Sequence, residues 1–145
     1  MSKQPLHLLK IGGKVVEDDN VLNQVLNDFI QLPGQKILVH GGGKRASALG
    51  KQLGIPAQMI EGRRVTDADT LEIVTMVYAG LYNKKVVVQL QAKDCNAIGL
   101  SGADGNLIRA HKRSGWTQDY GFAGDIDVIN AQGLSQLLEA DFTPV

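Results

Sequence analysis

Three consecutive glycines, Gly41–Gly43, are the residues of this sequence best suited to hold an anion. They follow the apolar run Ile37–His40 and precede a helix-compatible stretch, a pattern that predicts a buried strand, a tight loop and a helix N-terminus. Because glycine has no Cβ, an oxyanion can approach the backbone N–H groups closely, and the helix dipole adds partial positive charge. The alternative is a turn that only lets a strand and a helix pack, but such a turn needs one or two glycines and not three.

Lys10 stands beside a second group of glycines, Gly12 and Gly13. The apolar run Leu6–Ile11 predicts a central parallel strand, and Lys10 lies at its carboxyl end, the edge of an open α/β sheet at which ligands bind. A lysine there can contact phosphate oxygens, although it can equally extend into solvent. Residues 21–30 have helical spacing, so strand, helix and strand form a right-handed unit that brings both glycine loops to one sheet edge.

The adjacent residues Arg63 and Arg64 are candidates to bind a carboxylate, because a guanidinium can donate two parallel hydrogen bonds to it. For Arg63 we favour an exposed surface position. Residues 58–66 predict a strand or the arm of a hairpin. Thr66 is predicted to cap a helix that continues to Gly80, with Asp69 completing a capping box.

The second half of the chain continues the pattern with less certain elements. Residues 84–92 fit either a strand or a helix, and residues 96–100 predict a short buried strand before a third glycine-rich loop, 101–106, which equally fits a simple turn. The remaining expectations are an exposed hairpin or flap over 111–124, a final helix capped by Asn130, and a strand that begins at Phe142.

Composition indicates one ordinary globular domain. The chain has 145 residues, of which 43% are hydrophobic and 21% charged. Its 15 basic and 15 acidic residues cancel, which argues against binding to nucleic acid or membrane surfaces through bulk charge. The single cysteine, Cys95, allows no internal disulfide and no cysteine metal cluster, and no apolar run approaches the length of a membrane span. We therefore expect a cytoplasmic protein.

Four motifs, in order along the chain, resemble those of the acetylglutamate kinases, which belong to the amino-acid kinase family. They are Lys10–Gly13, Val39–Lys44, Gly62–Asp67 and Gly99–Asn106. The resemblance covers essentially the whole chain. It implies an α/β fold, a three-layer αβα sandwich with a mainly parallel sheet. It also implies ATP-dependent phosphorylation of the γ-carboxylate of N-acetylglutamate, or of another N-acylglutamate, in arginine and ornithine biosynthesis.

The same resemblance implies a role for each candidate residue. Lys10 would lie on the transferring phosphoryl group, and Arg64 would bind the α-carboxylate of the substrate. Gly42 and Gly43 would donate main-chain hydrogen bonds to the substrate carboxylate and the phosphoryl group, with Gly12, Gly13 and Gly41 completing the phosphate loops. These roles agree with the needs of phosphoryl transfer, which depends on positioning and charge neutralisation.

Members of that family are longer than this chain, so we expect residues 1–145 to form the N-terminal, substrate-binding lobe. The pocket for ATP with Mg²⁺ is expected in the absent C-terminal half, no metal ligand is assigned here, and the chain alone is predicted to be inactive. Helix 67–80 is expected to form a homodimer, since its apolar residues cover more than one face. Two alternatives remain, a non-catalytic module that binds an acidic amino acid and another amino-acid kinase; the acyl group stays open.

Overall fold

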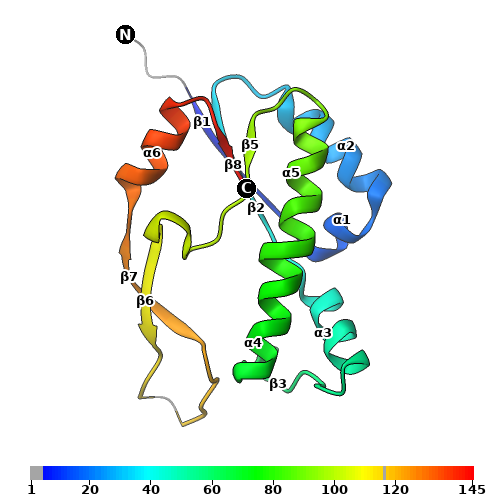
Figure 1. Cartoon of the computed structure of the whole chain (residues 1–145), viewed down its shortest axis with the longest axis vertical. Coiled ribbons are helices and arrows are strands. Elements are labelled where there is room, and N and C mark those ends of the chain that lie inside the picture. The colour runs from blue at the N-terminus through cyan, green and yellow to red at the C-terminus, as the bar shows by residue number, and fades with distance from the viewer. Residues whose placement is uncertain (1–4, 116) are drawn as a thin grey trace.

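The computed structural model describes residues 5–115 and 117–145, and Figure 1 shows their arrangement. Strands β1, β2, β5 and β8 lie between helices α2 and α5 at one side and α6 with the β6–β7 hairpin at the other. This arrangement confirms the predicted α/β class. The elements in chain order are β1 (Leu6–Ile11), α1 (Gly13–Glu17), α2 (Asp19–Ile30), β2 (Gln35–His40), α3 (Gly43–Gln52), β3 (Met59–Ile60), β4 (Arg63–Arg64), α4 (Ala68–Thr75), the π-helix η1 (Met76–Tyr82), α5 (Asn83–Gln91), β5 (Ala97–Ile98), the 3₁₀ turn η2 (Asp104–Asn106), β6 (Ile108–Lys112), β7 (Gly124–Ile129), α6 (Ala131–Glu139) and β8 (Thr143–Pro144).

Strands β1 and β2 run parallel, with Lys10 opposite Val39 and Ile11 opposite His40. Strands β5 and β8 form a second parallel pair, while β3–β4 and β6–β7 are antiparallel hairpins. The prediction of a central β1 is wrong for the described part of the chain. There β1 pairs only with β2, and Leu8 is 68% exposed. Residues of β1 alternate between exposed and less exposed, because the described residues bury only one face of this strand.

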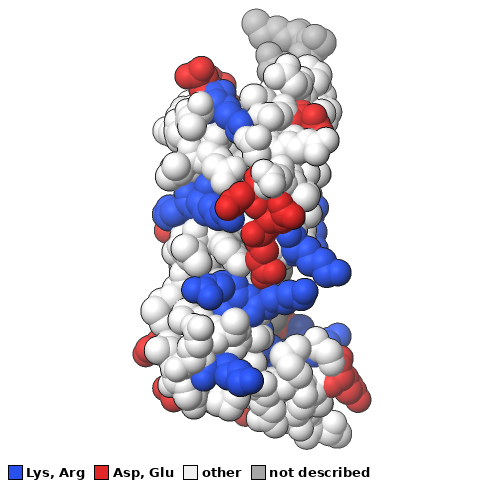
Figure 2. Space-filling model, turned by 90° about the vertical axis from the view of Figure 1, so that its right-hand side faces the viewer, with Lys and Arg blue, Asp and Glu red and all other residues white. Residues whose placement is uncertain are grey.

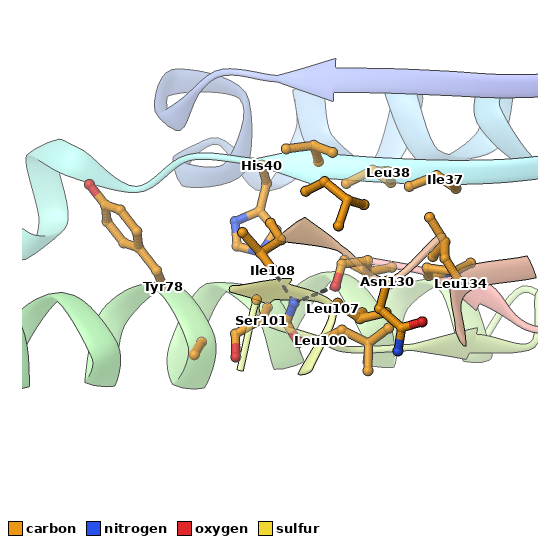
Figure 3. Close-up of a pocket in the computed structure, with 17 residues that line it drawn as sticks. Ile37, Leu38, His40, Tyr78, Leu100, Ser101, Leu107, Ile108, Asn130 and Leu134 are labelled. Carbon is orange, nitrogen blue, oxygen red and sulfur yellow. Dashed lines mark hydrogen bonds between the residues drawn. The ribbon is translucent and has the colours of Figure 1, made fainter. Parts of the chain in front are cut away.

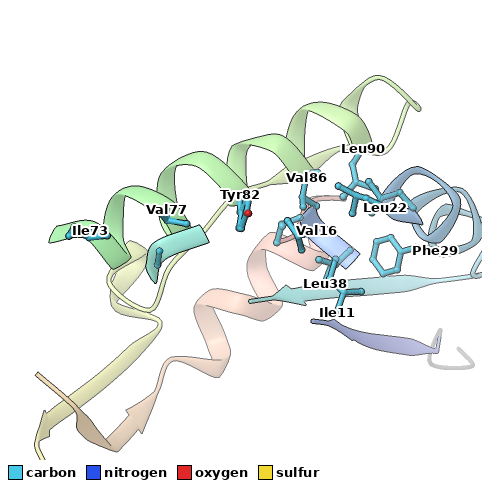
Figure 4. Close-up of a cluster of buried hydrophobic side chains, with 14 residues drawn as sticks. Ile11, Val16, Leu22, Phe29, Leu38, Ile73, Val77, Tyr82, Val86 and Leu90 are labelled. Carbon is cyan, nitrogen blue, oxygen red and sulfur yellow. The ribbon is translucent and has the colours of Figure 1, made fainter. Parts of the chain in front are cut away.

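The hydrophobic core lies between β1–β2 and the helices α1, α2 and α5 (Figure 4). Ile11 and Leu38 face it from the two strands, and Leu22, Leu26 and Phe29 face it from α2. Spacings of three and four residues place those three side chains on one face of the helix. Asp18 is the N-cap of this helix, and its carboxylate accepts hydrogen bonds from the backbone N–H groups of Asn20 and Val21.

Helices α4, η1 and α5 follow one another without a break, so the predicted end near Gly80 is wrong. The open choice for residues 84–92 is resolved as a helix. Val86 and Leu90 are fully buried one turn apart while Val88 is 66% exposed, which is a helical and not a strand pattern. Burial of one helix face against the core outweighs the local strand preference of the valines.

The cap of α4 also differs from the expectation. Asp67, and not Thr66, is the N-cap, because its Oδ1 accepts a hydrogen bond of 2.8 Å from the backbone N–H of Thr70. Thr66 instead bonds through its backbone, donating to Tyr120 O and accepting from the N–H of Phe122. The pairing with residues 120–122 holds Thr66 in extended structure, so the helix starts one residue later.

The C-terminal elements agree with the expectations in kind but not in their bounds. The β6–β7 ribbon is the exposed hairpin, but it extends from 108 to 129 and not only from 111 to 124, and β8 begins at Thr143 and not at Phe142. A hydrogen bond joins His111 Nδ1 to Asp127 Oδ1, and an ion pair joins Arg113 to Asp125. Asn130 caps α6, with its Oδ1 accepting a hydrogen bond from the N–H of Gly133.

On the face shown in Figure 2, lysines and arginines are interspersed with acidic residues, so no single sign of charge covers it. No helix in the described ranges is long and apolar enough to span a bilayer.

Candidate functional site

Two glycine loops meet at the carboxyl edge of the β1–β2 pair. The N–H of Gly41 donates to Ile11 O, which continues the strand register into the loops. A Cβ on Gly13 would lie 3.6 Å from the backbone N of Gly42 and 3.7 Å from that of Gly43. Parallel strands end at the same edge, so the prediction that both loops share it is confirmed.

Helices α1 and α3 begin in these loops, at Gly13 and Gly43. Neither N-cap residue, Gly12 or Gly42, makes a side-chain capping bond. The first N–H groups of an α-helix have no partner within the helix, so the ten-residue α3 presents open donors beside the loop. The predicted phosphate-loop residues Gly12, Gly13 and Gly41 therefore lie together with Gly42 and Gly43.

The surroundings of the three glycines in the second loop, Gly41–Gly43, differ in whether they leave room for a side chain. A Cβ on Gly42 would lie 2.7 Å from Tyr82 Cδ2 and 2.8 Å from Tyr78 Cδ1, so packing alone requires glycine there. A Cβ on Gly41 or Gly43 would meet other atoms no closer than 3.4 Å. Packing against the described residues therefore does not require glycine at those two positions. The contact of Tyr78 and Tyr82 with this loop could not be predicted from the sequence, since both lie on the π-helix η1, more than thirty residues further along the chain.

The guanidinium of Arg64 reaches the second loop from the β3–β4 hairpin. Its Nη2 donates to Gly43 O at 3.0 Å and to Ser47 Oγ at 2.8 Å. The hairpin turns at Glu61 and Gly62, both with positive φ, as a two-residue turn of this kind requires. Successive strand residues point to opposite faces, so Arg63 points away from this loop. The structure therefore brings Arg64 to this loop and leaves Arg63 exposed, as the sequence analysis favoured.

Lys10 lies at the same sheet edge, one residue before the end of β1. Its side chain is exposed and shares the face of Leu8, opposite the core residue Ile11. It makes no hydrogen bond or ion pair with any described residue. The expected site is therefore assembled around Gly13, the 41–43 loop and Arg64, with Lys10 at its border.

An apolar cavity of about 380 Å³ opens next to the second loop (Figure 3). His40 and Tyr78 line its end nearest the loop, and Ser101 and Asn130 contribute polar atoms. Its apolar walls include Ile37, Val39, Leu100, Leu107, Ile108 and Leu134. Sequence reasoning missed this cavity, because its walls come from strands and loops far apart along the chain.

Asn83 connects the strand ends around this cavity. It is 2% exposed, and its Nδ2 donates to Val145 O at 2.9 Å and lies 3.4 Å from His40 Nε2. Lys84 Nζ donates to Asn83 Oδ1 and to Gly99 O. The network joins the end of β2, directly before the second loop, to the residues that follow β8 and β5.

The third glycine-rich loop, 101–106, is closed by its own hydrogen bonds. Asp104 Oδ2 accepts from Ser101 Oγ at 2.7 Å and from the Ser101 N–H at 2.6 Å. These bonds lower the pKa of the Asp104 carboxyl, because they stabilise its charged form. The arrangement supports the interpretation of this loop as a turn.

No group of three or more His, Cys, Asp or Glu residues in the described ranges could hold a metal ion.

Comparison with known proteins gives one family. A profile of the Amino acid kinase family matches residues 6–145. Acetylglutamate kinase from Phocaeicola vulgatus is 53% identical over 143 residues, which is 99% of this chain and 56% of that protein. Acetylglutamate kinase from Methanopyrus kandleri is 41% identical over 144 residues, covering 97% of this chain and 56% of that protein. The chain spans about half the length of the curated relatives it matches.

Solved structures give the same fold. The smu.665 protein from Streptococcus mutans superposes with a TM-score of 0.76 at 26% identity, covering 96% of this chain and 56% of that one. N-acetylglutamate synthase from Neisseria gonorrhoeae, complexed with coenzyme A and N-acetyl-glutamate, superposes with a TM-score of 0.75 at 22% identity. The superposition covers 96% of this chain and 33% of the synthase chain. At 22% identity the similarity concerns the fold alone.

Proposed function

The chain belongs to the amino acid kinase family, and we propose that residues 1–145 form the half of an acetylglutamate kinase that binds the N-acylglutamate substrate. Identities of 41–53% to proteins of that name support the substrate class. The complete reaction would be ATP-dependent phosphorylation of the γ-carboxylate in arginine biosynthesis. A cytoplasmic location is part of the same proposal.

One observation carries the proposal: the Arg64 guanidinium lies on the loop that also offers the open N–H groups of α3. A substrate with two carboxylates needs two anion sites a short distance apart. Arg64 would receive the α-carboxylate, and the N–H groups of Gly42 and Gly43 would receive the γ-carboxylate and the phosphoryl oxygens. Donors fixed before the reaction need no rearrangement as charge develops, which is the main source of such catalysis.

Lys10 would add its ammonium to the phosphoryl oxygens from the border of the site, where its exposed side chain has freedom to move. The described residues provide no acidic cluster for Mg²⁺, so they do not fit a metal site by themselves. ATP and its magnesium are therefore assigned to the other half of a full-length kinase, where ATP supplies the phosphoryl group.

We also propose that the protein forms a homodimer through helix 67–80. Ile73 and Val77 are buried in the core, whereas Leu71, Met76 and Leu81 of the continuous helix are exposed. The helix therefore presents a second apolar face that the described residues do not cover.

The test is an ATP-dependent hydroxamate assay on two proteins. One is the 145-residue chain, and the other is that chain joined to the remaining part of the Phocaeicola vulgatus relative. We expect hydroxamate from N-acetylglutamate with the extended protein only. Titration of the short chain with N-acetylglutamate, followed by NMR, is expected to shift the N–H signals of Gly42 and Gly43.

Other outcomes would contradict parts of the proposal. Equal turnover by the short chain would show that the nucleotide site lies within it. Turnover of glutamate or aspartate in place of N-acetylglutamate would identify another amino-acid kinase. Folded extended protein that binds N-acetylglutamate without turnover would support a non-catalytic binding module. N-succinylglutamate, tested in parallel, distinguishes the acyl groups.

A further inference from the structure

Ser47 links the glycine loop to Arg64. It lies on α3 one turn after Gly43, and its hydroxyl donates to Gly43 O at 3.1 Å. The same Oγ accepts from Arg64 Nη2 at 2.8 Å, while that nitrogen also donates to Gly43 O at 3.0 Å. The three groups form a closed triangle of hydrogen bonds between two elements, α3 and β4.

A serine in a helix often bonds the carbonyl four residues earlier, so the bond to Gly43 alone is ordinary. The bond from Arg64 to Ser47 is unusual, because it joins side chains that are 17 residues apart in the sequence. Of the three guanidinium nitrogens, only Nη2 takes part in this bond. The other guanidinium nitrogens, Nε and Nη1, make no hydrogen bond with any described residue.

Arginine has a long side chain that loses much rotational freedom when a ligand fixes it. A side chain that the protein already holds through one nitrogen has lost that freedom before the ligand arrives, so binding is tighter. The carbonyl of Gly43 provides one anchor and Ser47 the second. Two anchors define the position of a planar group better than one.

We propose that Ser47 is a positioning residue, which holds Arg64 so that Nε and Nη1 are presented to the carboxylate of the substrate. The inference rests on the function proposed above and adds a residue that contacts the arginine and not the ligand. The side-chain hydroxyl accepts the bond from Arg64, so threonine, which also has a hydroxyl, is expected to perform the same role as serine.

The test compares Ser47→Ala and Ser47→Thr in the extended protein, with Ser135→Ala as the matched control. Ser135 is an exposed serine of α6, away from the triangle. For Ser47→Ala we expect KM for N-acetylglutamate to rise about three- to tenfold, with kcat unchanged. The rise is smaller than the full value of a hydrogen bond from a charged donor, because the second anchor of the guanidinium, Gly43 O, remains. Ser47→Thr and Ser135→Ala should stay within about twofold of the parent. An unchanged KM in Ser47→Ala, or a failure of threonine to restore it, would overturn the proposal.

The ¹⁵N–¹H signals of the Arg64 guanidinium in the 145-residue chain, without ligand, give an independent readout. A fixed guanidinium rotates slowly, and Ser47→Ala should accelerate that rotation while Ser135→Ala leaves it unchanged. Equal rotation in the chain and in Ser47→Ala would overturn the positioning role. If the extended protein has no affinity for N-acetylglutamate, the proposed function fails together with the ligand part of this inference, and the guanidinium signals still decide the positioning part.

Discussion

The ring of Tyr78 lies against the backbone of Gly42, where a Cβ would come within 2.8 Å of its Cδ1. The contact connects the π-helix η1 to the loop in which α3 begins. A π-turn widens a helix locally and often occurs at functional sites. Here it lies where the helix meets the glycine loop, so the loop conformation depends on a helix more than thirty residues further along the chain.

Gly42→Ala is expected to destabilise the protein. The added methyl would collide with Tyr78 and Tyr82, and overpacking of this kind costs about 1–3 kcal/mol. Gly41→Ala is the matched control, because its nearest described neighbour would be Gly13 N at 3.7 Å. Urea unfolding of both variants measures the difference; equal stabilities would show that the tyrosine rings move aside freely.

Arg64→Ala is expected to raise KM for N-acetylglutamate in the extended protein by roughly ten- to hundredfold, the effect of losing a hydrogen bond to a charged group. Arg63→Ala is the control, since Arg63 points to the opposite face of β4. Its KM should stay within about twofold of the parent. A larger rise of KM in Arg63→Ala than in Arg64→Ala would show that our proposal assigns the substrate carboxylate to the wrong arginine.

Stability is expected to fall in acid partly through Asp67. Its bond from Thr70 lowers the pKa of the carboxyl, so the stabilisation is present above the unfolded pKa of about 4 and is lost as pH falls through the folded pKa. Asn is an equally good N-cap but does not titrate. Asp67→Asn should therefore match the parent near pH 7 and lose less stability between about pH 5 and pH 2. Thermal unfolding measures this, and parallel pH curves for the two proteins would contradict it.

The dimer proposal predicts that Met76→Lys converts a dimer to a monomer. Met76 is 50% exposed on the helix face that we assign to the interface, and a buried lysine charge there would be costly. Leu8→Lys is the control, because Leu8 is exposed on the edge strand β1. Light scattering after size-exclusion chromatography gives the mass of each. If Leu8→Lys were a monomer and Met76→Lys a dimer, the interface would lie on β1 and not on the helix.

The order of local elements could be predicted from the sequence, because it depends on neighbouring residues. An apolar strand that ends in glycines, followed by a helix and a second such strand, can only bring both loops to one edge of a parallel pair. The cap at Asn130 and the exposed hairpin are equally local, since each depends on residues that are close in the chain.

Only the tertiary structure decided features that join distant residues. The bond from Arg64 to Ser47 spans 17 positions and the contact of Asn83 with His40 spans 43, and no spacing rule links such pairs. The pairing of Thr66 with residues 120–122 moved the helix cap to Asp67, and burial of Val86 and Leu90 made residues 83–91 helical. Local preferences of a few tenths of a kcal/mol yield to burial of a side chain, which is worth about 1.5–3 kcal/mol. The sequence therefore predicted that two glycine-rich loops lie at one edge of the sheet and favoured Arg64 over Arg63, and packing decided which serine and tyrosine side chains surround the second loop.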